Sequence, residues 1–449
     1  MTMLRHRDLS ACSLPRIYAE TGEAPPESEI LVGNVQCDVA IIGAGITGAS
    51  AALHLAEAGT DVRLIEASHV GAAGSGRSFG QVVPYLRREP TGVHTDLGPE
   101  VGERLIAVAA AAPALVRGLV DRYAIDCDAD VRGLLFAAHA ASGVEILRRR
   151  REEWARRGVD LTFLDADETA AAIGGGTYLA ALIEPRGLTL NPLAYVRGLI
   201  RAAIEKGAHL YTKSPVIEIL PHAGCWQLST AAGSLVCRTL IVAAGVHVGR
   251  LLPVLRRRIL PFRVHEAATG PLPAEALAGI LERYPALTDT RRLPSGVRRT
   301  TDNRLIVTLS GATGFRGSAD LAGGQARLRQ LFPQQQTPSF AESWAGWVDL
   351  SVDQYPRLVE MARGLFVGYG LSGRGIALGT ALGRALALVS LDGRPEDSGF
   401  PGHGSRLRSW APGSRLAVAT AANLIRRIEE WHARRSRPLI RSNIISAGP

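Results

Sequence analysis

The sequence lacks any uninterrupted apolar run of about 18 residues, the length that a membrane-spanning helix needs. The stretch 376–391 is broken by Arg384, and the first residues contain no apolar signal-peptide core. The five cysteines follow no metal-binding or CxxC spacing, and an odd number cannot all pair within one chain. We therefore expect a reduced, cytoplasmic protein without a membrane span or a metal site.

Lysine is nearly absent, with only Lys206 and Lys213, so arginine carries the basic charge. Residues 401–449 hold nine arginines against two acids, which places +7 of the net charge of +9 in this tail. No recognised nucleic-acid motif accompanies the charge, so no nucleic-acid partner is expected. Apolar residues recur in the tail at near-helical spacing, which indicates either a helix packed on its own protein or a contact with an oligomer or partner.

Glycine is abundant, and three glycines follow the apolar stretch 38–42 with the spacing of a dinucleotide-binding turn. Gly43 permits a sharp turn, Gly45 lets the backbone approach a pyrophosphate, and Gly48 allows a helix to pack closely on a sheet. The helix is expected to begin near Ile46, where N–H groups and the helix dipole favour an anion. This pattern predicts a βαβ nucleotide-binding unit.

An acid ends the second apolar strand of this unit. Glu66 lies 18 residues beyond Gly48, near the spacing of about 20 for a carboxylate that accepts a hydrogen bond from a ribose 2′-OH. FAD and NAD both use such a unit, so the cofactor stays open at this point. The next stretch, 71–84, is too rich in glycine for a packed helix or strand, and Arg77 among its small residues suits a backbone that wraps a flavin.

Residues 75–81 resemble the second flavin loop of the FAD-dependent glycine/D-amino-acid oxidase family, which typically reads Ser-Gly-Arg-Asn-Gly-Gly-Gln. Ser78 and Phe79 depart from that pattern. The resemblance extends from about residue 35 to residue 390, and its segment order is most similar to the gamma-glutamylputrescine oxidase branch. The further matching segments are 183–187, 191–192, 241–245 and 364–376.

The last of these segments is an apolar strand followed by a glycine turn and a helix. In the family, such a turn sets a helix N-terminus against the flavin ring, where the helix dipole stabilises negative charge on the reduced ring. Arg374 stands where the family usually has histidine. The residues that the resemblance implies at the FAD are Gly43, Gly45, Ile46, Thr47, Gly48, Glu66, Ala67, Ser75, Gly76, Arg77, Ser78, Gly80, Gln81, Val216, Ala244, Gly245, Gly373, Arg374, Gly375 and Ile376.

The resemblance implies the α/β fold class, with a Rossmann-type FAD-binding domain interleaved with a mixed-sheet α+β substrate domain. A length of 449 residues, 46% of them hydrophobic, suits such a large core. The expected boundaries are 36–90, 190–255 and 340–392 for the FAD-binding domain, 91–189 and 256–339 for the substrate domain, and 393–449 for a basic tail with a helix.

The resemblance also implies an activity, the oxidation of the C–N bond of an amine or amino acid to an imine, with hydride passed to flavin and O2 as the expected final acceptor, giving H2O2. Some relatives attach flavin through a cysteine in the segment like 340–353 or a histidine in the second glycine loop. Neither is present here, so we expect non-covalent FAD. Two alternatives stay open, a non-catalytic flavin-binding sensor or assembly subunit that acts through the basic tail, and a nucleic-acid-modifying flavoenzyme.

Four residues are candidates for the substrate side, and no catalytic base is identified. Arg298 and Arg299 can clamp a carboxylate with two hydrogen bonds, although surface charges on a hairpin explain them equally well. Trp347 can form a wall of the site, and Tyr369 precedes the C-terminal flavin turn. His265 lies alone in an apolar stretch, which is more typical of a core histidine than of a catalyst.

Overall fold

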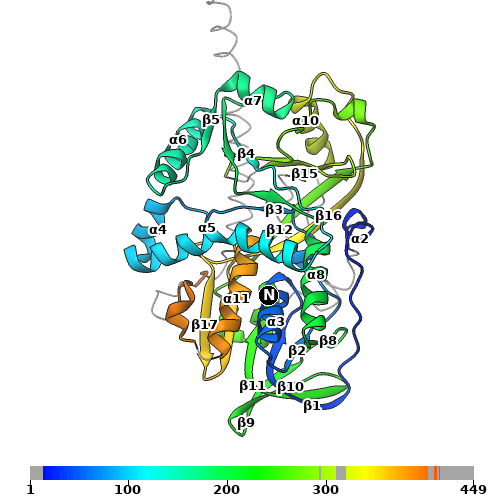
Figure 1. Cartoon of the computed structure of the whole chain (residues 1–449), viewed down its shortest axis with the longest axis vertical. Helices are drawn as coiled ribbons and strands as arrows, with labels where there is room; N and C mark the ends of the chain where they lie inside the picture. Colours follow the sequence, from blue (N-terminus) through cyan, green and yellow to red (C-terminus); the bar gives the residue numbers. More distant parts are fainter. Residues whose placement is uncertain are drawn as a thin grey trace, which may run out of the picture. The chain divides into compact units, whose positions relative to one another are not determined.

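The computed structural model describes residues 14–292, 295–309, 320–391, 393–402, 409–411 and 414. The chain divides into two compact units, each assembled from segments far apart in the sequence (Figure 1). Unit 1 contains the described residues through Ala129, then Leu190–Phe262 and those of Gly346–Ala411, and unit 2 contains those of Asp130–Thr189, Arg263–Ala345 and Pro412–Pro449.

Unit 1 is built on a largely parallel sheet. The strands of this sheet are β1 (Gly33–Ile42), β2 (Val62–Ile65), β8 (His209–Tyr211), β9 (Glu218–His222), β10 (Cys225–Ser229), β11 (Gly233–Val242), β17 (Arg357–Ala362) and β18 (Leu365–Tyr369), and the short strand β3 (Gln81–Val82) lies outside it. The main path runs β17-β18-β11-β1-β2-β8, with β17 antiparallel and the other pairs parallel. The inner strands end in continuous apolar runs, as expected of parallel strands covered on both faces.

The helices of unit 1 are α2 (Arg16–Ala19), α3 (Ile46–Glu57), α4 (Pro90–Leu97), α5 (Pro99–Arg122), α8 (Pro192–Glu205), α9 (Val248–Leu251) and α11 (Ala377–Leu391). In Figure 1, α3 lies between α11 and α8. Small residues bring α3 and α11 together, since a Cβ on Gly383 would lie 2.3 Å from the Thr47 carbonyl oxygen, and one on Gly379 would lie 3.2 Å from Thr47 Oγ1. Thr47 and Gly379 both lie in first turns, so the two helix N-termini are side by side.

Unit 2 carries a mixed sheet with the order β16-β12-β15-β14-β13-β4-β6-β5. The pairs from β12 to β13 and from β4 to β5 are antiparallel, and β13 pairs in parallel with β4. The elements of unit 2 are β4 (Leu134–Ala138), α6 (Ala141–Ala155), β5 (Thr162–Leu164), α7 (Ala166–Ile173), β6 (Ala180–Glu184), β7 (Leu188–Thr189), β13 (Ala286–Asp289), β14 (Gly296–Arg299), β15 (Leu305–Leu309) and α10 (Leu321–Leu331). Two strands are shared, since β12 (Leu260–Thr269) belongs to unit 2 from Arg263 on and β16 (Phe340–Leu350) belongs to it as far as Ala345.

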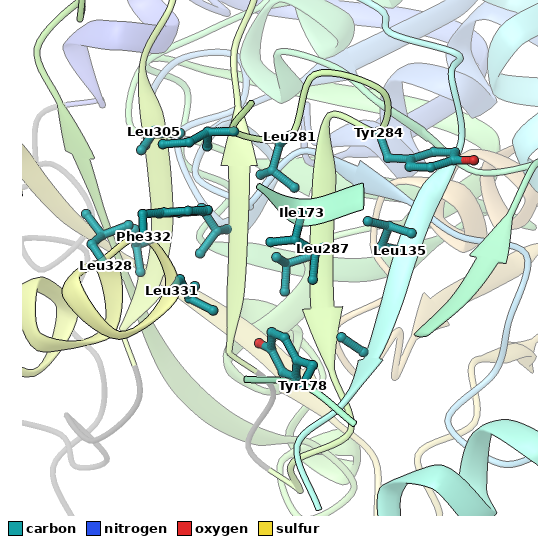
Figure 2. Close-up of a cluster of buried hydrophobic side chains, with 14 of the residues drawn as sticks. Leu135, Ile173, Tyr178, Leu281, Tyr284, Leu287, Leu305, Leu328, Leu331 and Phe332 are labelled. Atoms are coloured by element: carbon teal, nitrogen blue, oxygen red, sulfur yellow. The ribbon is translucent and has the colours of Figure 1, made fainter. Parts of the chain in front are cut away.

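One face of the unit 2 sheet is covered by an apolar cluster (Figure 2). Leu287 of β13 and Leu305 of β15 contribute from the sheet, Ile173 from the end of α7, and Leu328 and Leu331 from α10. Burial of a leucine or isoleucine side chain contributes about 1.5–3 kcal/mol. The cluster therefore holds α7 and α10 on this face.

The predicted fold class is confirmed, since unit 1 carries a parallel sheet with helices and unit 2 carries a mixed sheet. The grouping of three segments differs from the sequence-based boundaries, and one of them, 256–262, is expected in the substrate domain but groups with unit 1. Residues 91–129 were assigned to the substrate domain, but they group with unit 1, because α5 packs against α11. Residues 340–345, expected in the FAD-binding domain, group with unit 2.

Two expectations concern the tail and the membrane. The apolar stripe expected in the tail at 416–431 lies outside the described residues, as do 403–408, 412–413 and 415–449 in general. Among the helices that the structure does describe, none has the length and apolar character needed to cross a membrane.

Candidate active site

The glycine turn between β1 and α3 has no room for side chains. Gly43 has a φ of +108°, and a Cβ there would lie 2.8 Å from the Ala243 carbonyl oxygen and 3.4 Å from Ala244 Cα. A Cβ on Gly48 would lie only 1.9 Å from the Gly43 carbonyl oxygen. The first and third glycines are thus required by contacts within the protein, and the turn lies directly against the end of β11.

The start of α3 is joined to the second glycine loop. Gly45 is the N-cap and offers no side-chain hydrogen bond, and a Cβ on it would lie 2.8 Å from Ser75 Oγ. Ile46 N donates to Ser75 Oγ over 3.0 Å. Gly45 therefore makes room for the Ser75 hydroxyl, a reason that adds to the predicted approach of a pyrophosphate. The N–H groups of the following turn, which begins at Thr47, lie at the positive end of the helix dipole.

Glu66 follows β2 and bridges two backbone segments. Its Oε2 accepts from Ala44 N and its Oε1 accepts from Ser68 N, both over 2.9 Å. Burial raises the pKa of this carboxyl, while the backbone donors oppose that rise. The Glu66 carbonyl accepts from Ser214 N over 3.0 Å, which brings the segment leading to Val216 beside it. Each carboxylate oxygen has a second lone pair and can accept a further hydrogen bond. The contact of Glu66 with a ribose hydroxyl therefore stays a prediction that these backbone bonds allow.

The second glycine loop includes a short 3-10 turn, Gly74–Gly76. Arg77 is only 5% exposed, and its Nε donates to the Ala72 carbonyl oxygen over 3.0 Å, so the guanidinium helps to hold the loop. A Cβ on Gly74 would lie 2.6 Å from the Trp347 carbonyl oxygen, which places the end of β16 against the loop. Ser78 Oγ is buried and has no hydrogen-bond partner among the described residues.

The C-terminal glycine turn between β18 and α11 is held by a buried acid. Asp349 Oδ2 accepts from Gly370 N over 2.7 Å and from Leu371 N over 3.2 Å. Burial raises the pKa of Asp349 to about 6. Arg87 Nε donates to the Ser372 carbonyl oxygen over 2.9 Å, and Ser372 has a φ of +50°. Sequence reasoning did not single out Asp349 or Arg87, because their partners are distant along the chain.

These segments of unit 1 fit a bound dinucleotide. The first glycine turn, the second glycine loop and the strand end at Ala243 are joined by the contacts above, and the N-termini of α3 and α11 lie side by side. Two adjacent helix N-termini favour negatively charged groups such as phosphates. Ser78 Oγ supplies a buried polar atom without a protein partner. FAD contacts at the individual residues, including Gly373, stay predictions.

The two candidate arginines of β14 have different surroundings. Val297 belongs to the apolar cluster of unit 2, so Arg298 points to the opposite face of the sheet. Arg299 donates through Nη1 to the carbonyl oxygens of Leu277 and Ile280, over 3.1 and 3.0 Å. Arg299 therefore ties a loop of unit 2 in place. Arg298 is buried, with 4% exposure, rather than a surface charge on a hairpin.

A further charged residue on this face was missed by sequence reasoning. Glu266 of β12 alternates with Ala267 of the apolar cluster, so it shares the opposite face with Arg298. It is 3% exposed, and burial raises its pKa to about 8, opposed by a hydrogen bond from Thr308 and by the charge of Arg298. An acid inside the apolar stretch 264–268 is the signal that could have drawn attention to it.

The remaining candidates lie in less polar positions. Tyr369 is 3% exposed and packs in the apolar cluster of the unit 1 sheet, which favours a structural role. Trp347 is half-buried beside the second glycine loop, so a role at the site stays a prediction. Burial lowers the pKa of His265 to about 4, so this core histidine is neutral near pH 7.

Comparison with known proteins agrees with this geometry. The family described as FAD dependent oxidoreductase (DAO) matches residues 38–388, and the chain belongs to this family. The chain is 29% identical over 373 residues to gamma-glutamylputrescine oxidoreductase of Escherichia coli (strain K12), which covers 82% of this chain and 87% of that protein. It is 26% identical over 371 residues to glycine oxidase of Geobacillus kaustophilus (strain HTA426), which covers 78% and 92%.

Solved structures show the same fold. The crystal structure of glycine oxidase from Geobacillus kaustophilus gives a TM-score of 0.66 at 23% identity, over 80% of this chain and 94% of that chain. Iminodiacetate oxidase from Chelativorans sp. BNC1 gives 0.66 at 23% identity, over 81% and 99%. The predictions of the family, of an FAD-dependent enzyme and of amine or amino-acid oxidoreduction are confirmed. The sensor alternative finds no support in these comparisons.

Proposed function

We propose that the protein oxidises the C–N bond of an amine that also carries a carboxylate, giving an imine that water hydrolyses. Arg298 carries this proposal, because a buried guanidinium on the face opposite the apolar cluster suits a carboxylate, which it can hold with two parallel hydrogen bonds. The names of the relatives support the same class. Glycine, iminodiacetate and gamma-glutamylputrescine each contain an amine nitrogen and a carboxylate.

FAD supplies the hydride acceptor when it is bound. In this proposal the chain's own residues bind and orient the two molecules. The first turn of α3 and the loop around Ser75 and Ser78 hold the cofactor, Asp349 fixes the turn before α11, and Arg298 orients the substrate through its carboxylate. Orientation of the reacting C–H bond is a large contribution that a protein can make to such a reaction.

Oxygen as the final electron acceptor and a cytoplasmic location are further parts of the proposal. The scattered cysteines of the sequence support a reducing compartment. Both lysines, Lys206 and Lys213, are exposed, so neither supports a role for lysine in oxygen reduction.

The test adds amines to the FAD-loaded enzyme under anaerobic conditions and measures the flavin absorbance at about 450 nm. Glycine, iminodiacetate and gamma-glutamylputrescine are compared with methylamine and putrescine, which have no carboxylate. We expect bleaching by at least one of the first three and little by the others. Air should then restore the colour with release of H2O2. Equal bleaching by amines without a carboxylate, or none by any amine, would contradict the proposal.

A further inference from the structure

Glu266 is an unusual group to find inside a sheet. The Thr308 side chain of the neighbouring strand hydrogen-bonds to its carboxyl group, whereas Oε2 is buried and has no partner among the described residues. A buried carboxylate without compensating donors costs several kcal/mol. The fold therefore keeps a polar group where an apolar residue would stabilise the sheet more, which is typical of a group retained for binding.

The charge beside Glu266 limits what it can bind. Glu266 and Arg298 share one face of the sheet, with a strand between them, and the positive charge of Arg298 favours the ionised carboxyl. A carboxylate acceptor and a guanidinium donor on the same face match a ligand that carries both a cation and an anion. An anion alone would use only Arg298, and a simple amine would use only Glu266.

We propose that Glu266 binds the ammonium group of the substrate, while Arg298 binds its carboxylate, so that the substrate is a zwitterionic amino acid. This inference rests on the proposed function and adds a specificity-determining residue to it. An ammonium group placed on Oε2 gives that oxygen the charged hydrogen-bond donor that it lacks within the protein. The rival explanation is a purely structural ion pair between Glu266 and Arg298.

The test measures binding without turnover, on enzyme whose FAD is kept reduced under anaerobic conditions. The probes are glycine, 4-aminobutanoate and 6-aminohexanoate, each paired with its amine-free analogue, acetate, butanoate or hexanoate. Glu266→Gln removes the ionisable carboxyl group but keeps the size and shape of the side chain and an oxygen that can accept from Thr308. Asp289→Asn is the matched control, because Asp289 is an equally buried acid of unit 2 that already accepts from Ser295 N and pairs with Arg327.

We expect the wild type to prefer the amino acid in at least one pair. Glu266→Gln should raise the dissociation constant of that amino acid by about tenfold or more and change that of its amine-free analogue by less than about twofold. Glu266→Asp should restore part of the preference, and Asp289→Asn should leave it intact. The inference is overturned if the wild type shows no preference in any pair. It is also overturned if Glu266→Gln weakens the binding of the amino acid and of its amine-free analogue equally. Normal binding selectivity without flavin bleaching by any amine would instead refute only the proposed oxidation.

Discussion

At the scale of single residues, Gly48 is the position with the least room. A Cβ there would lie 1.9 Å from the Gly43 carbonyl oxygen and 3.1 Å from the Gly43 carbonyl carbon, which are backbone atoms and cannot move aside as the end of a flexible side chain could. Gly48→Ala should therefore displace the start of α3 and abolish FAD binding, measured as flavin absorbance after purification. Gly118→Ala in α5 is the control, since nothing lies within 4 Å of that Cβ. A yellow Gly48→Ala protein would contradict this prediction.

Arg298 and Arg299 should respond differently to the same substitution. Lysine keeps the charge but loses the planar fork, so Arg298→Lys should raise KM for a carboxylated substrate by about tenfold or more, as loss of about 1.4 kcal/mol implies. Arg299→Lys should leave KM unchanged and lower the free energy of unfolding by about 2 kcal/mol, since it loses bonds to the carbonyls of Leu277 and Ile280. Steady-state kinetics measures KM, and thermal unfolding measures stability, for both variants. If Arg299→Lys raises KM and Arg298→Lys lowers only the stability, Arg299 is the substrate-binding residue and Arg298 the structural one.

The same pair shows what the sequence can predict at this scale. Strand periodicity predicts that Arg298 and Arg299 face opposite ways, but it does not say which of them faces the apolar cluster. That choice depends on α7, α10 and the loop at 277–280, which come from distant parts of the chain. Glu266 was missed for a related reason, because its burial depends on strands paired far along the chain.

At the scale of elements, the turn before α11 depends on the ionisation of Asp349. Its pKa is raised by burial from 3.8 to about 6, so the folded state binds its proton more tightly than the unfolded state does. The stability that this proton contributes is present below pH 3.8 and is lost as the pH rises through about 6. The ionised form is the costly one, although it accepts from Gly370 N and Leu371 N.

Asp349→Asn removes this dependence, because the amide oxygen can accept the same two bonds without a charge. As the pH rises from about 4 to about 7, the unfolding free energy of the variant should increase by about 3 kcal/mol relative to that of the wild type. Urea unfolding of the FAD-loaded proteins at several pH values measures the difference. If the unfolding free energies of the wild type and the variant change in the same way with pH, the pKa of Asp349 is not raised in the folded protein.

The elements that could be predicted from sequence carry local signals. Asn191 caps α8 by accepting from Leu193 N and Ala194 N, and Pro192 occupies its first turn, as the Asn-Pro pair indicates. The start of α3 is marked by its glycines in the same way. The place of α5 in unit 1 could not be predicted, because it depends on packing against α11, which lies more than 250 residues further along the chain.

At the scale of the whole molecule, FAD should dissociate on denaturation. The second glycine loop contains no histidine, and residues 340–353 contain no cysteine, so the attachment residues of covalent relatives are absent. Acid precipitation should leave the yellow cofactor in the supernatant, measured by its absorbance. Colour retained in the protein pellet would show a covalent bond at another residue.

The end of unit 1 determines how much of the tail can be removed. Trp410 Nε1 donates to the Leu350 carbonyl oxygen over 3.1 Å, and Phe400 is only 4% exposed, so residues beyond Asp397 contribute to the fold of unit 1. A chain truncated after Ala411 should keep its FAD and still bleach with substrate. A chain truncated after Asp397 loses both aromatic contacts and should have a lower thermal midpoint and a lower flavin content.

The pair of truncations also tests the expected partner contact of the basic tail. Removal of 412–449 deletes most of the tail charge, so an oligomer or partner held through it should be lost while hydride transfer continues. Light scattering measures the mass in solution, and anaerobic bleaching measures hydride transfer. If truncation after Ala411 leaves the mass unchanged and removes the flavin, the tail belongs to the folded flavoprotein and serves no separate assembly role.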